Sequence, residues 1–276
     1  MGLKKTLTIA GSDTSGGAGI AADLKTFQEH ETYGYTALTT IVSMVPDTWS
    51  HRVSPIDLDT VKDQIETALS IGPDAIKTGM LPSEEVIQMS EQAFLNSNAE
   101  FFVVDPVMVC KGEDEVLNPG LVDAMIKHLV PHATVITPNL FEASQLVGEK
   151  TPKTIEAVKM IAKKIHDKGA KHVVIKGGSD IAGEKAVDVY FDGTDYYLLT
   201  ADKIDSTYNH GAGCTFAAAI TANLANGKSV LDSIKDAKSF VTSAIKNGWK
   251  MNAFVGPVRH GAANSVETIE VEVEKI

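Results

Sequence analysis

The 276-residue sequence has only two cysteines, Cys110 and Cys214, and its acidic side chains outnumber the basic ones by 36 to 25. Two thiols are too few for a disulfide framework, and their spacing does not match a metal site, so any role they have depends on the thiols themselves. The formal net charge of −11 leaves no basic stripe for the phosphates of nucleic acid, which excludes a nucleic-acid partner. A nucleotide can still bind where local groups outweigh this charge.

A long apolar run is absent as well. The N-terminal residues lead almost directly into a strand-like segment, and no later stretch is long enough to cross a bilayer. We therefore expect no signal peptide, no transmembrane helix, no membrane partner, and a cytoplasmic location. The hydrophobic content of 43% is sufficient for a large core. Because no linker, repeat or low-complexity tract interrupts the chain, a single domain spanning residues 1–276 is predicted.

Short runs rich in β-branched residues alternate with segments of helical periodicity. The runs lack the polar–apolar alternation of half-exposed strands, which indicates strands buried on both faces. Strands are predicted at 7–10, 38–42, 75–77, 101–104, 134–137 and 172–176, and helices at 57–70, 83–96, 119–129, 154–168, 213–226 and 230–247. This alternation predicts βαβ units, and hence an α/β fold with a mainly parallel central sheet.

Two later segments depart from the alternation. Residues 185–191 and 196–200, separated by an Asp-Gly dipeptide, predict an antiparallel hairpin at the edge of the sheet. Residues 266–275 alternate between apolar and polar side chains, which predicts a final edge strand. The segment 45–53, by contrast, is predicted to be a loop.

A glycine-rich segment, Gly11–Gly19, follows the first predicted strand. In a parallel sheet, ligands bind beyond the carboxyl ends of the strands, so this segment is a candidate ligand-binding turn. Asp13 and the nearby Asp23 favour a polar substrate, because carboxylates accept hydrogen bonds from hydroxyl groups. A simple flexible turn is the alternative. The letters of a dinucleotide fingerprint also occur at 17–22, but the next strand ends without the acidic residue that would bind a ribose.

Polar side chains end three further strands. Asp105 ends one buried strand, and Asn139 and Glu142 follow the next one along the chain. Lys176 ends a third, where an ammonium group can offset the charge of a triphosphate. Because these strand ends share one edge of the sheet, their coincidence favours a metal–nucleotide site. The alternatives are local: Asp105 as a capping aspartate, and Asn139 with Glu142 as a capping box at a helix start.

The strongest local signal is the turn Gly211-Ala212-Gly213-Cys214 before a run of small residues. Glycines allow close approach of the backbone, and the unpaired N–H groups at a helix N-terminus bind anions. The same terminus is expected to lower the pKa of the Cys214 thiol, which would place some thiolate beside the anion site. The alternative is that Cys214 is simply a small residue packed at the helix start.

In this order, the motifs closely resemble those of the ribokinase-like family, in its bacterial branch of pyridoxal kinases and hydroxymethylpyrimidine (phosphate) kinases. The resemblance covers nearly the whole chain and combines LTIAGSDTSGGAGIAADLKTF (7–27), AIKTGML (75–81), VVDPVMV (103–109), TPNLFEA (137–143), VIKGG (174–178) and HGAGCTFAAAI (210–220). It implies a three-layer α/β/α fold with a mainly parallel sheet and an edge hairpin. It also implies ATP as co-substrate, Mg²⁺ as cofactor, room for a monovalent cation, and a homodimer.

Both cysteines bear on the choice within this branch. Ribokinase-like enzymes usually carry aspartate where this chain has Cys214, and its combination with Cys110 resembles the dual-cysteine pyridoxal kinases of Gram-positive bacteria. The pyrimidine kinases usually have glutamine where this chain has Met44. The resemblance therefore implies ATP-dependent phosphorylation of the hydroxymethyl group of pyridoxal. A hydroxymethylpyrimidine (phosphate) kinase of thiamine synthesis, or a bifunctional enzyme, remains the alternative. Rivals from other classes are a dinucleotide oxidoreductase and a vitamin-binding protein without catalysis.

The resemblance also implies a set of residues for each part of the site. The ATP site would contain Asp105, Asn139, Lys176, Gly177, Gly178, Ser179, Asp180, Asp188, Gly213 and Lys238, with Glu142 helping to hold Mg²⁺. The substrate would contact Gly11, Asp13, Asp23, His51, Met80 and Cys110. In the catalytic hypothesis, the backbone of Gly211, Ala212, Gly213 and Cys214 holds the γ-phosphoryl group, and Cys214 accepts the hydroxymethyl proton.

Overall fold

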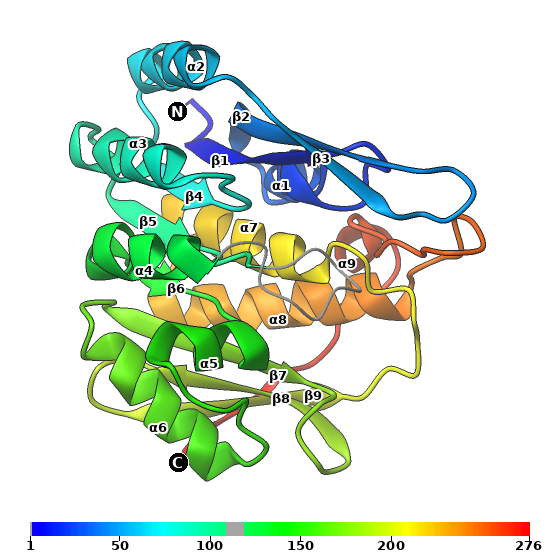
Figure 1. Cartoon of the computed structure of the whole chain (residues 1–276). Coiled ribbons are helices and arrows are strands. Elements are labelled where there is room, and N and C mark those ends of the chain that lie inside the picture. The colour runs from blue at the N-terminus through cyan, green and yellow to red at the C-terminus, as the bar shows by residue number, and fades with distance from the viewer. Residues whose placement is uncertain (1, 109–118) are drawn as a thin grey trace.

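The computed structural model describes residues 2–108 and 119–276, and strands and helices alternate along most of the chain (Figure 1). In chain order the elements are β1 (Lys5–Asp13), α1 (Gly19–Glu29), β2 (Tyr33–Met44), β3 (His51–Pro55), α2 (Leu58–Ile71), β4 (Ala75–Thr78), α3 (Glu84–Leu95), β5 (Phe101–Val104), α4 (Pro119–His128), the 3₁₀ turn η1 (Val130–His132), β6 (Val135–Ile136), α5 (Leu140–Val147), α6 (Ile155–His166), β7 (His172–Gly178), β8 (Lys185–Phe191), β9 (Tyr196–Asp202), α7 (Ala212–Ala225), α8 (Val230–Lys246), α9 (Ala262–Ser265) and β10 (Glu272–Lys275). None of the described helices has the length and apolar character to cross a bilayer.

All of these strands belong to one ten-stranded sheet with the order β10-β9-β8-β7-β6-β5-β4-β1-β2-β3. The neighbouring pairs from β2 to β7 are parallel. Antiparallel strands extend both ends, with β3 beside β2 and with β8, β9 and β10 beyond β7. The predicted α/β fold with a mainly parallel sheet and a hairpin at one end is therefore confirmed. β10 adds the predicted last edge strand, although it begins only at Glu272.

Helices cover both faces of the sheet (Figure 1). On one face α2 to α6 contact one another in sequence, and on the other face α1, α7 and α8 pack together. Each face has its own core: Phe102 of β5 belongs to one and its neighbour Val103 to the other. Successive side chains of a strand point to opposite faces, so a sheet covered on both sides needs apolar residues at every position. This explains why the parallel strands read as continuous apolar runs.

The segment 45–53 contains part of a strand that its sequence did not predict. β3 pairs antiparallel with β2, with Met44 opposite His51. Its sequence, HRVSP, is largely exposed and includes a proline, so no apolar periodicity marks it. The pairing depends on the free edge of β2 instead. The predicted loop is therefore wrong from His51 onward, and His51 begins a strand at the end of the sheet.

α7 brings the predicted anion-binding turn to the middle of the molecule. Its residues from Thr215 to Ala225 are all buried, and it packs against β4 and β5 as well as α1 and α8. Mostly small side chains permit this close packing on every side. Gly211 precedes the helix with a φ of 81°, and a Cβ there would lie 1.8 Å from the carbonyl oxygen of Gly17. Only glycine fits this contact between the two glycine-rich turns.

Candidate active site

A cavity of about 360 Å³ opens at the carboxyl edge of the parallel strands. It is lined by many of the predicted site residues: Gly11, Asp13, His51, Met80, Asp105, Asn139, Glu142, Lys176, Gly211, Ala212, Gly213 and Cys214. Its other lining residues were not predicted as site residues: Ala10, Ser12, Ala18, Gly19, Val42, Lys77, Gly79, Val107, Asn209 and His210. Segments far apart in the sequence thus meet at one place, as ligand sites in parallel α/β sheets do.

The N-terminus of α7 faces this cavity. Gly211 caps the helix without a side-chain hydrogen bond, and the N–H group of Ala212 already has a backbone acceptor. The N–H groups of Gly213 and Cys214 have no acceptor within the described part of the chain. Lys176 Nζ lies 3.4 Å from the position that a Cβ of Gly213 would take. Free N–H groups, the positive end of the helix dipole and an ammonium group together form a site for a phosphoryl group.

A buried charge cluster lies beside this helix terminus. Lys176 Nζ donates to Asp105 Oδ1 at 3.2 Å. Glu142 Oε2 accepts from the N–H group of Asn139 at 2.8 Å, and Asn139 Oδ1 accepts from the N–H group of Glu142 at 2.8 Å, so the capping box is present. Burial raises the pKa of Glu142 to about 7, while Lys176 opposes the rise and Asp105 adds to it. A cation placed here would favour the ionised carboxylate.

The donor atoms of this cluster fit Mg²⁺ bound together with a nucleotide. Among the described residues, no group of three or more His, Cys, Asp or Glu side chains could hold a metal ion by itself. Mg²⁺ commonly uses one or two carboxylates and takes its other ligands from water and substrate phosphates. Asp105 and Glu142 supply hard oxygen atoms on the cavity wall, next to the phosphate site.

The turn after β7 is supported by a buried ion pair. Asp188 Oδ1 accepts from the N–H groups of Gly177 and Gly178 at 3.0 and 3.2 Å. Lys238 Nζ lies 2.7 Å from Asp188 Oδ2, and both side chains are buried. Neither side chain lines the described cavity, and residues 179–180 continue the turn at the surface. The structure thus places Asp188 and Lys238 behind the end of β7, where they fix the backbone of Gly177 and Gly178, and their predicted contact with ATP stays a prediction.

Asp13 forms a hydrogen bond with His210 that sequence spacing did not reveal. Its Oδ2 lies 2.5 Å from His210 Nε2, and its Oδ1 accepts from the N–H group of Ser15 at 2.7 Å. Burial opposes the ionised form, but the hydrogen bonds from His210 and Ser15 outweigh it and hold the pKa of Asp13 below its usual value. A carboxylate fixed in this way can accept a hydrogen bond from a substrate. The adjacency of His210 to the glycine turn is its only signal in the sequence.

Asp23, which was predicted to contact the substrate, does not line the cavity. It is fully buried, and its Oδ2 accepts from Thr8 Oγ1 at 2.7 Å and from Lys77 Nζ at 3.0 Å. The prediction is wrong because spacing from the glycine turn gives only the distance along the chain. The direction of the side chain depends on how α1 packs against the sheet, and Lys77 reaches the cavity wall instead.

Cys214 is partly exposed at the cavity, yet its thiol is not the low-pKa group that a helix terminus alone predicts. Burial raises the pKa of Cys214 to about 12; Lys77 opposes this rise, and Asp23 and Asp105 add to it. The expectation of a lowered pKa is therefore wrong. It considered the local helix terminus, whereas the tertiary fold encloses the sulfur and brings two carboxylates near it.

Comparison with known proteins gives this geometry a family. A family profile described as phosphomethylpyrimidine kinase matches residues 13–259. The chain belongs to the phosphomethylpyrimidine kinase family. Within the family, it is 62% identical to the pyridoxal kinase of Staphylococcus aureus solved in complex with ADP, with a TM-score of 0.97 and 100% of both chains covered. The same enzyme solved with pyridoxal gives a TM-score of 0.96 at 61% identity, again over 100% of both chains.

Two relatives from Bacillus subtilis (strain 168) represent different substrates within the phosphomethylpyrimidine kinase family. The pyridoxine kinase is 53% identical over 264 residues, which are 95% of this chain and 97% of the relative. The hydroxymethylpyrimidine/phosphomethylpyrimidine kinase is 38% identical over 271 residues, 97% of this chain and 99% of the relative. These similarities confirm the resemblance that the motifs predicted, and identity is higher to the pyridoxine kinase.

The remaining predicted substrate contacts of this family member divide into two groups. Gly11, His51 and Met80 lie on the cavity wall. At Gly11 a Cβ would lie 2.7 Å from Thr40 Cγ2, so glycine permits the close approach of β1 and β2 there. Cys110 lies outside the described residues. Met44, at the position where pyrimidine kinases usually carry glutamine, does not line the cavity.

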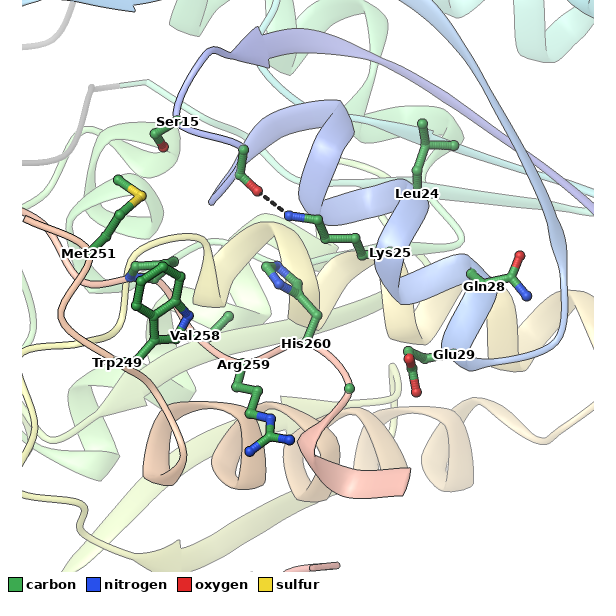
Figure 2. Close-up of a pocket in the computed structure, with 13 residues that line it drawn as sticks. Ser15, Leu24, Lys25, Gln28, Glu29, Trp249, Met251, Val258, Arg259 and His260 are labelled. Atoms are coloured by element: carbon green, nitrogen blue, oxygen red, sulfur yellow. Dashed lines mark hydrogen bonds between the residues drawn. The ribbon is translucent and has the colours of Figure 1, made fainter. Parts of the chain in front are cut away.

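A second cavity, of about 570 Å³, adjoins the Ser15–Gly16 turn between α1 and the C-terminal segment (Figure 2). Lys25 Nζ donates to the carbonyl oxygen of Gly16 at 2.6 Å, the bond drawn dashed in the figure. The same turn carries the Ser15 N–H group that binds Asp13. The Lys25 contact therefore steadies the substrate-side turn of this phosphomethylpyrimidine kinase family member from outside the active cavity.

Proposed function

We propose that this protein transfers the γ-phosphoryl group of ATP to the hydroxymethyl group of pyridoxal and related B6 vitamers, giving pyridoxal 5′-phosphate and ADP. The observation that carries the proposal is one cavity in which the α7 N-terminus and Lys176 adjoin Gly11 and Asp13. A phosphoryl donor and a polar acceptor can therefore meet at the same helix terminus. The full-length similarity to a pyridoxal kinase solved with ADP and with pyridoxal supports the same function.

On the nucleotide side, we assign Asn139, Lys176, Gly213 and the turn at 177–180 to ATP binding. Bound with the nucleotide and with Glu142 among its ligands, Mg²⁺ would neutralise charge on the transferring group. Lys176 Nζ lies 3.4 Å from the Cβ position of Gly213, so it can compensate the same charge from the protein side. Positioning and charge compensation account for most of the catalysis in phosphoryl transfer.

On the substrate side, we assign proton acceptance to Cys214. As the substrate oxygen bonds to the γ-phosphorus and the bond to ADP breaks, the hydroxymethyl proton moves to the Cys214 sulfur. Only the thiolate can accept it, so the step depends on groups that oppose the effect of burial on the Cys214 pKa. A loose transition state lowers the demand on this base, because the alcohol becomes acidic only late in the transfer.

Cys110 is assigned to the aldehyde of pyridoxal. Its thiolate adds to the carbonyl carbon of the aldehyde, and the carbonyl oxygen takes up a proton, which gives a reversible hemithioacetal. In this proposal Lys111, the next residue in the sequence, favours the thiolate. Cys110→Ala is expected to lower kcat/KM for pyridoxal about ten-fold more than for pyridoxine, which has no aldehyde. Steady-state kinetics with both vitamers measure this difference. Equal losses for the two substrates would refute aldehyde capture.

The alternative activity, phosphorylation of hydroxymethylpyrimidine, is tested on the same enzyme. With ATP and Mg²⁺ held constant, we expect kcat/KM for pyridoxal to exceed that for hydroxymethylpyrimidine by about ten-fold or more. Met44, in place of the glutamine usual in pyrimidine kinases, and the higher identity to the pyridoxine kinase favour this order. A higher kcat/KM for hydroxymethylpyrimidine would overturn the proposed substrate. No ADP release with either compound would overturn the kinase itself.

Three further proposals concern the molecule as a whole. The single sheet draws strands from both ends of the chain, which supports one domain over residues 1–276. Its use of ATP supports a cytoplasmic location, where ATP is supplied. The resemblance to ribokinase-like kinases leads us to propose a homodimer and a monovalent cation near the phosphates. Light scattering of the purified protein measures the first, and rates in K⁺ against Na⁺ salts measure the second.

A further inference from the structure

Lys77 occupies a position for which the proposed reaction has as yet no role. It lies on β4, it is 0% exposed, and its Nζ is 3.0 Å from Asp23 Oδ2. Lysine is almost never fully buried without a partner, and this one also forms part of the active-cavity wall. A Cβ at Gly79 would lie 3.4 Å from Nζ, so the glycine that follows β4 leaves room for the ammonium group.

Asp23 holds this ammonium group from the side of α1. Its Oδ2 also accepts from Thr8 Oγ1 at 2.7 Å, whereas its Oδ1 has no hydrogen-bond partner among the described residues. Burying a carboxylate with an unsatisfied oxygen is unfavourable. Two well-packed apolar side chains of similar size would stabilise the fold as well as such a pair does. Because Lys77 reaches the cavity wall while Asp23 holds it from behind, the location of the pair points to a role in the site.

Cys214 lies in the first turn of α7, which packs against β4, and it lines the same cavity as Lys77. Lys77 of β4 and Lys176 of β7 favour its thiolate, and Asp23 of α1 and Asp105, which follows β5, oppose it. Of the groups that oppose the effect of burial on the Cys214 pKa, Lys77 has the largest influence. Lys176 is already paired with Asp105 at 3.2 Å on the nucleotide side.

We propose that Lys77 is a positioning residue for phosphoryl transfer: its buried ammonium group, held by Asp23, stabilises the thiolate of Cys214 that accepts the substrate proton. The proton leaves the hydroxymethyl oxygen, the sulfur takes it as that oxygen bonds to phosphorus, and the resulting thiol returns it to solvent after product release. The catalytic part of this inference rests on the proposed function. The effect of Lys77 on the thiol does not, because it can be measured without turnover.

Substitutions of the two members of the pair are expected to act in opposite directions. Lys77→Met removes the favourable charge, so it disfavours the Cys214 thiolate. Asp23→Asn removes an unfavourable charge and leaves the ammonium group of Lys77 uncompensated, so it favours the thiolate. General damage to the fold would lower activity in both variants but would not move a thiol titration in opposite directions.

The test follows alkylation of Cys214 by iodoacetamide as a function of pH. In a Cys110→Ala background Cys214 is the only thiol, because the chain has two cysteines. At neutral and mildly alkaline pH, below the pKa of the thiol, the rate is proportional to the thiolate fraction, so we expect Asp23→Asn to raise it about ten-fold at each pH and Lys77→Met to lower it. Rates that coincide in all three proteins, or that change in the same direction in both variants, would overturn the proposal.

Two further variants separate this effect from instability. Breaking a buried pair can prevent folding, so the double substitution Lys77→Met with Asp23→Asn replaces both charges at once and is expected to return the alkylation rate toward that of the background protein. Lys62→Met removes an exposed lysine that pairs with Glu66 on the surface of α2 and should leave the curve unchanged. In turnover, Lys77→Met should lower kcat about ten-fold or more, with KM for ATP little changed. An unchanged kcat with a shifted alkylation curve would contradict the role of Cys214 as base, and not the influence of Lys77 on its thiol.

Discussion

At Cys214, the positive end of α7 and the buried surroundings act on one thiol in opposite directions. The free N–H groups favour an anion there, whereas burial and the carboxylates of Asp23 and Asp105 disfavour the thiolate. A neutral thiol at rest is protected from non-specific alkylation and oxidation, because the thiolate is the reactive form. The base is then formed only to the extent that nearby cations and the bound substrates permit.

The proposed role of Cys214 as a base can be tested by substitution. Cys214→Ala is expected to lower kcat by about 10² to 10⁴, because a positioned general base is lost, while the free N–H groups that bind phosphate remain. KM for ATP should change little. Single-turnover measurement of phosphate transfer to pyridoxine gives the effect on the chemical step and avoids the aldehyde. Near-normal kcat in this variant would remove Cys214 from the mechanism.

At the residue scale, sequence patterns predicted which residues lie near the cavity better than they predicted which way their side chains point. Asp105, Asn139 and Lys176 were predicted at strand ends, and they meet because the ends of parallel strands share one edge. Asp23 was predicted to face the cavity, but Lys77, which was not predicted as a site residue, faces it instead, since only the packing of α1 on the sheet decides which of them does. The pKa of Cys214 was misjudged for the same reason: burial is a tertiary property.

At the element scale, the contact between the two glycine-rich turns fixes where α7 begins. Gly211→Ala would place a Cβ 1.8 Å from the Gly17 carbonyl oxygen and would force a residue with a side chain to adopt a φ of 81°. The start of α7 must then move, and a displacement of about 1 Å at a catalytic group can lower the rate about 10²-fold. We expect kcat/KM to fall by about that factor.

Gly227→Ala provides the matched control for this change. Gly227 also has a positive φ, of 85°, but no atom of the described residues lies within 4 Å of its Cβ position. Its substitution should lower thermal stability slightly and leave kcat/KM intact. If Gly211→Ala behaved in the same way as this control, the turn would not be positioning the helix N-terminus for catalysis.

The buried ion pair between Asp188 and Lys238 supports the end of β7. Asp188→Asn leaves the buried Lys238 ammonium group without its carboxylate, and breaking such a pair typically costs about 3–5 kcal/mol of unfolding free energy. The N–H groups of Gly177 and Gly178 lose a charged acceptor at the same time. We expect a lower denaturation midpoint and weaker ADP binding in calorimetry. Asp202→Asn, which breaks an exposed pair with Lys185, should change neither by more than a small amount.

The strands and helices that the sequence predicted correctly are those with a clear pattern of apolar residues. Buried parallel strands were predicted because both of their faces are apolar, and helices because their apolar positions recur with helical period. β3 was missed because it is largely exposed and owes its conformation to hydrogen bonds with β2. The last strand was predicted too long because Val266 begins the alternation, while pairing with β9 starts only at Glu272.

At the scale of the whole molecule, the cavity depends on nearly every parallel strand, since its wall takes residues from β1, β2, β4 and β7 and from the segments after β5 and β6. Global unfolding therefore abolishes the site as a unit.

The pH dependence of the folding stability includes a contribution from His260 of the C-terminal segment. This side chain is 8% exposed, and its Nε2 has no hydrogen-bond partner among the described residues. Burial lowers the pKa of His260 to about 4, and the charges of Lys25 and His210 lower it further.

The sign of this contribution follows from proton binding. Between the ordinary histidine pKa of about 6.5 and the folded value, the unfolded chain binds a proton that the folded protein does not, so stability falls as pH decreases through this window. A shift from 6.5 to about 4 corresponds to about 3 kcal/mol at most. His260→Gln removes this term, so its urea midpoint should fall less between pH 7.5 and pH 4.5 than that of the unmodified protein. Glu142 acts in the opposite direction in both proteins, because burial raises its pKa, and its effect cancels in the comparison. Equal losses of stability in the two proteins over this range would show that His260 is protonated in the folded state, and that the second cavity admits enough water to solvate its charge.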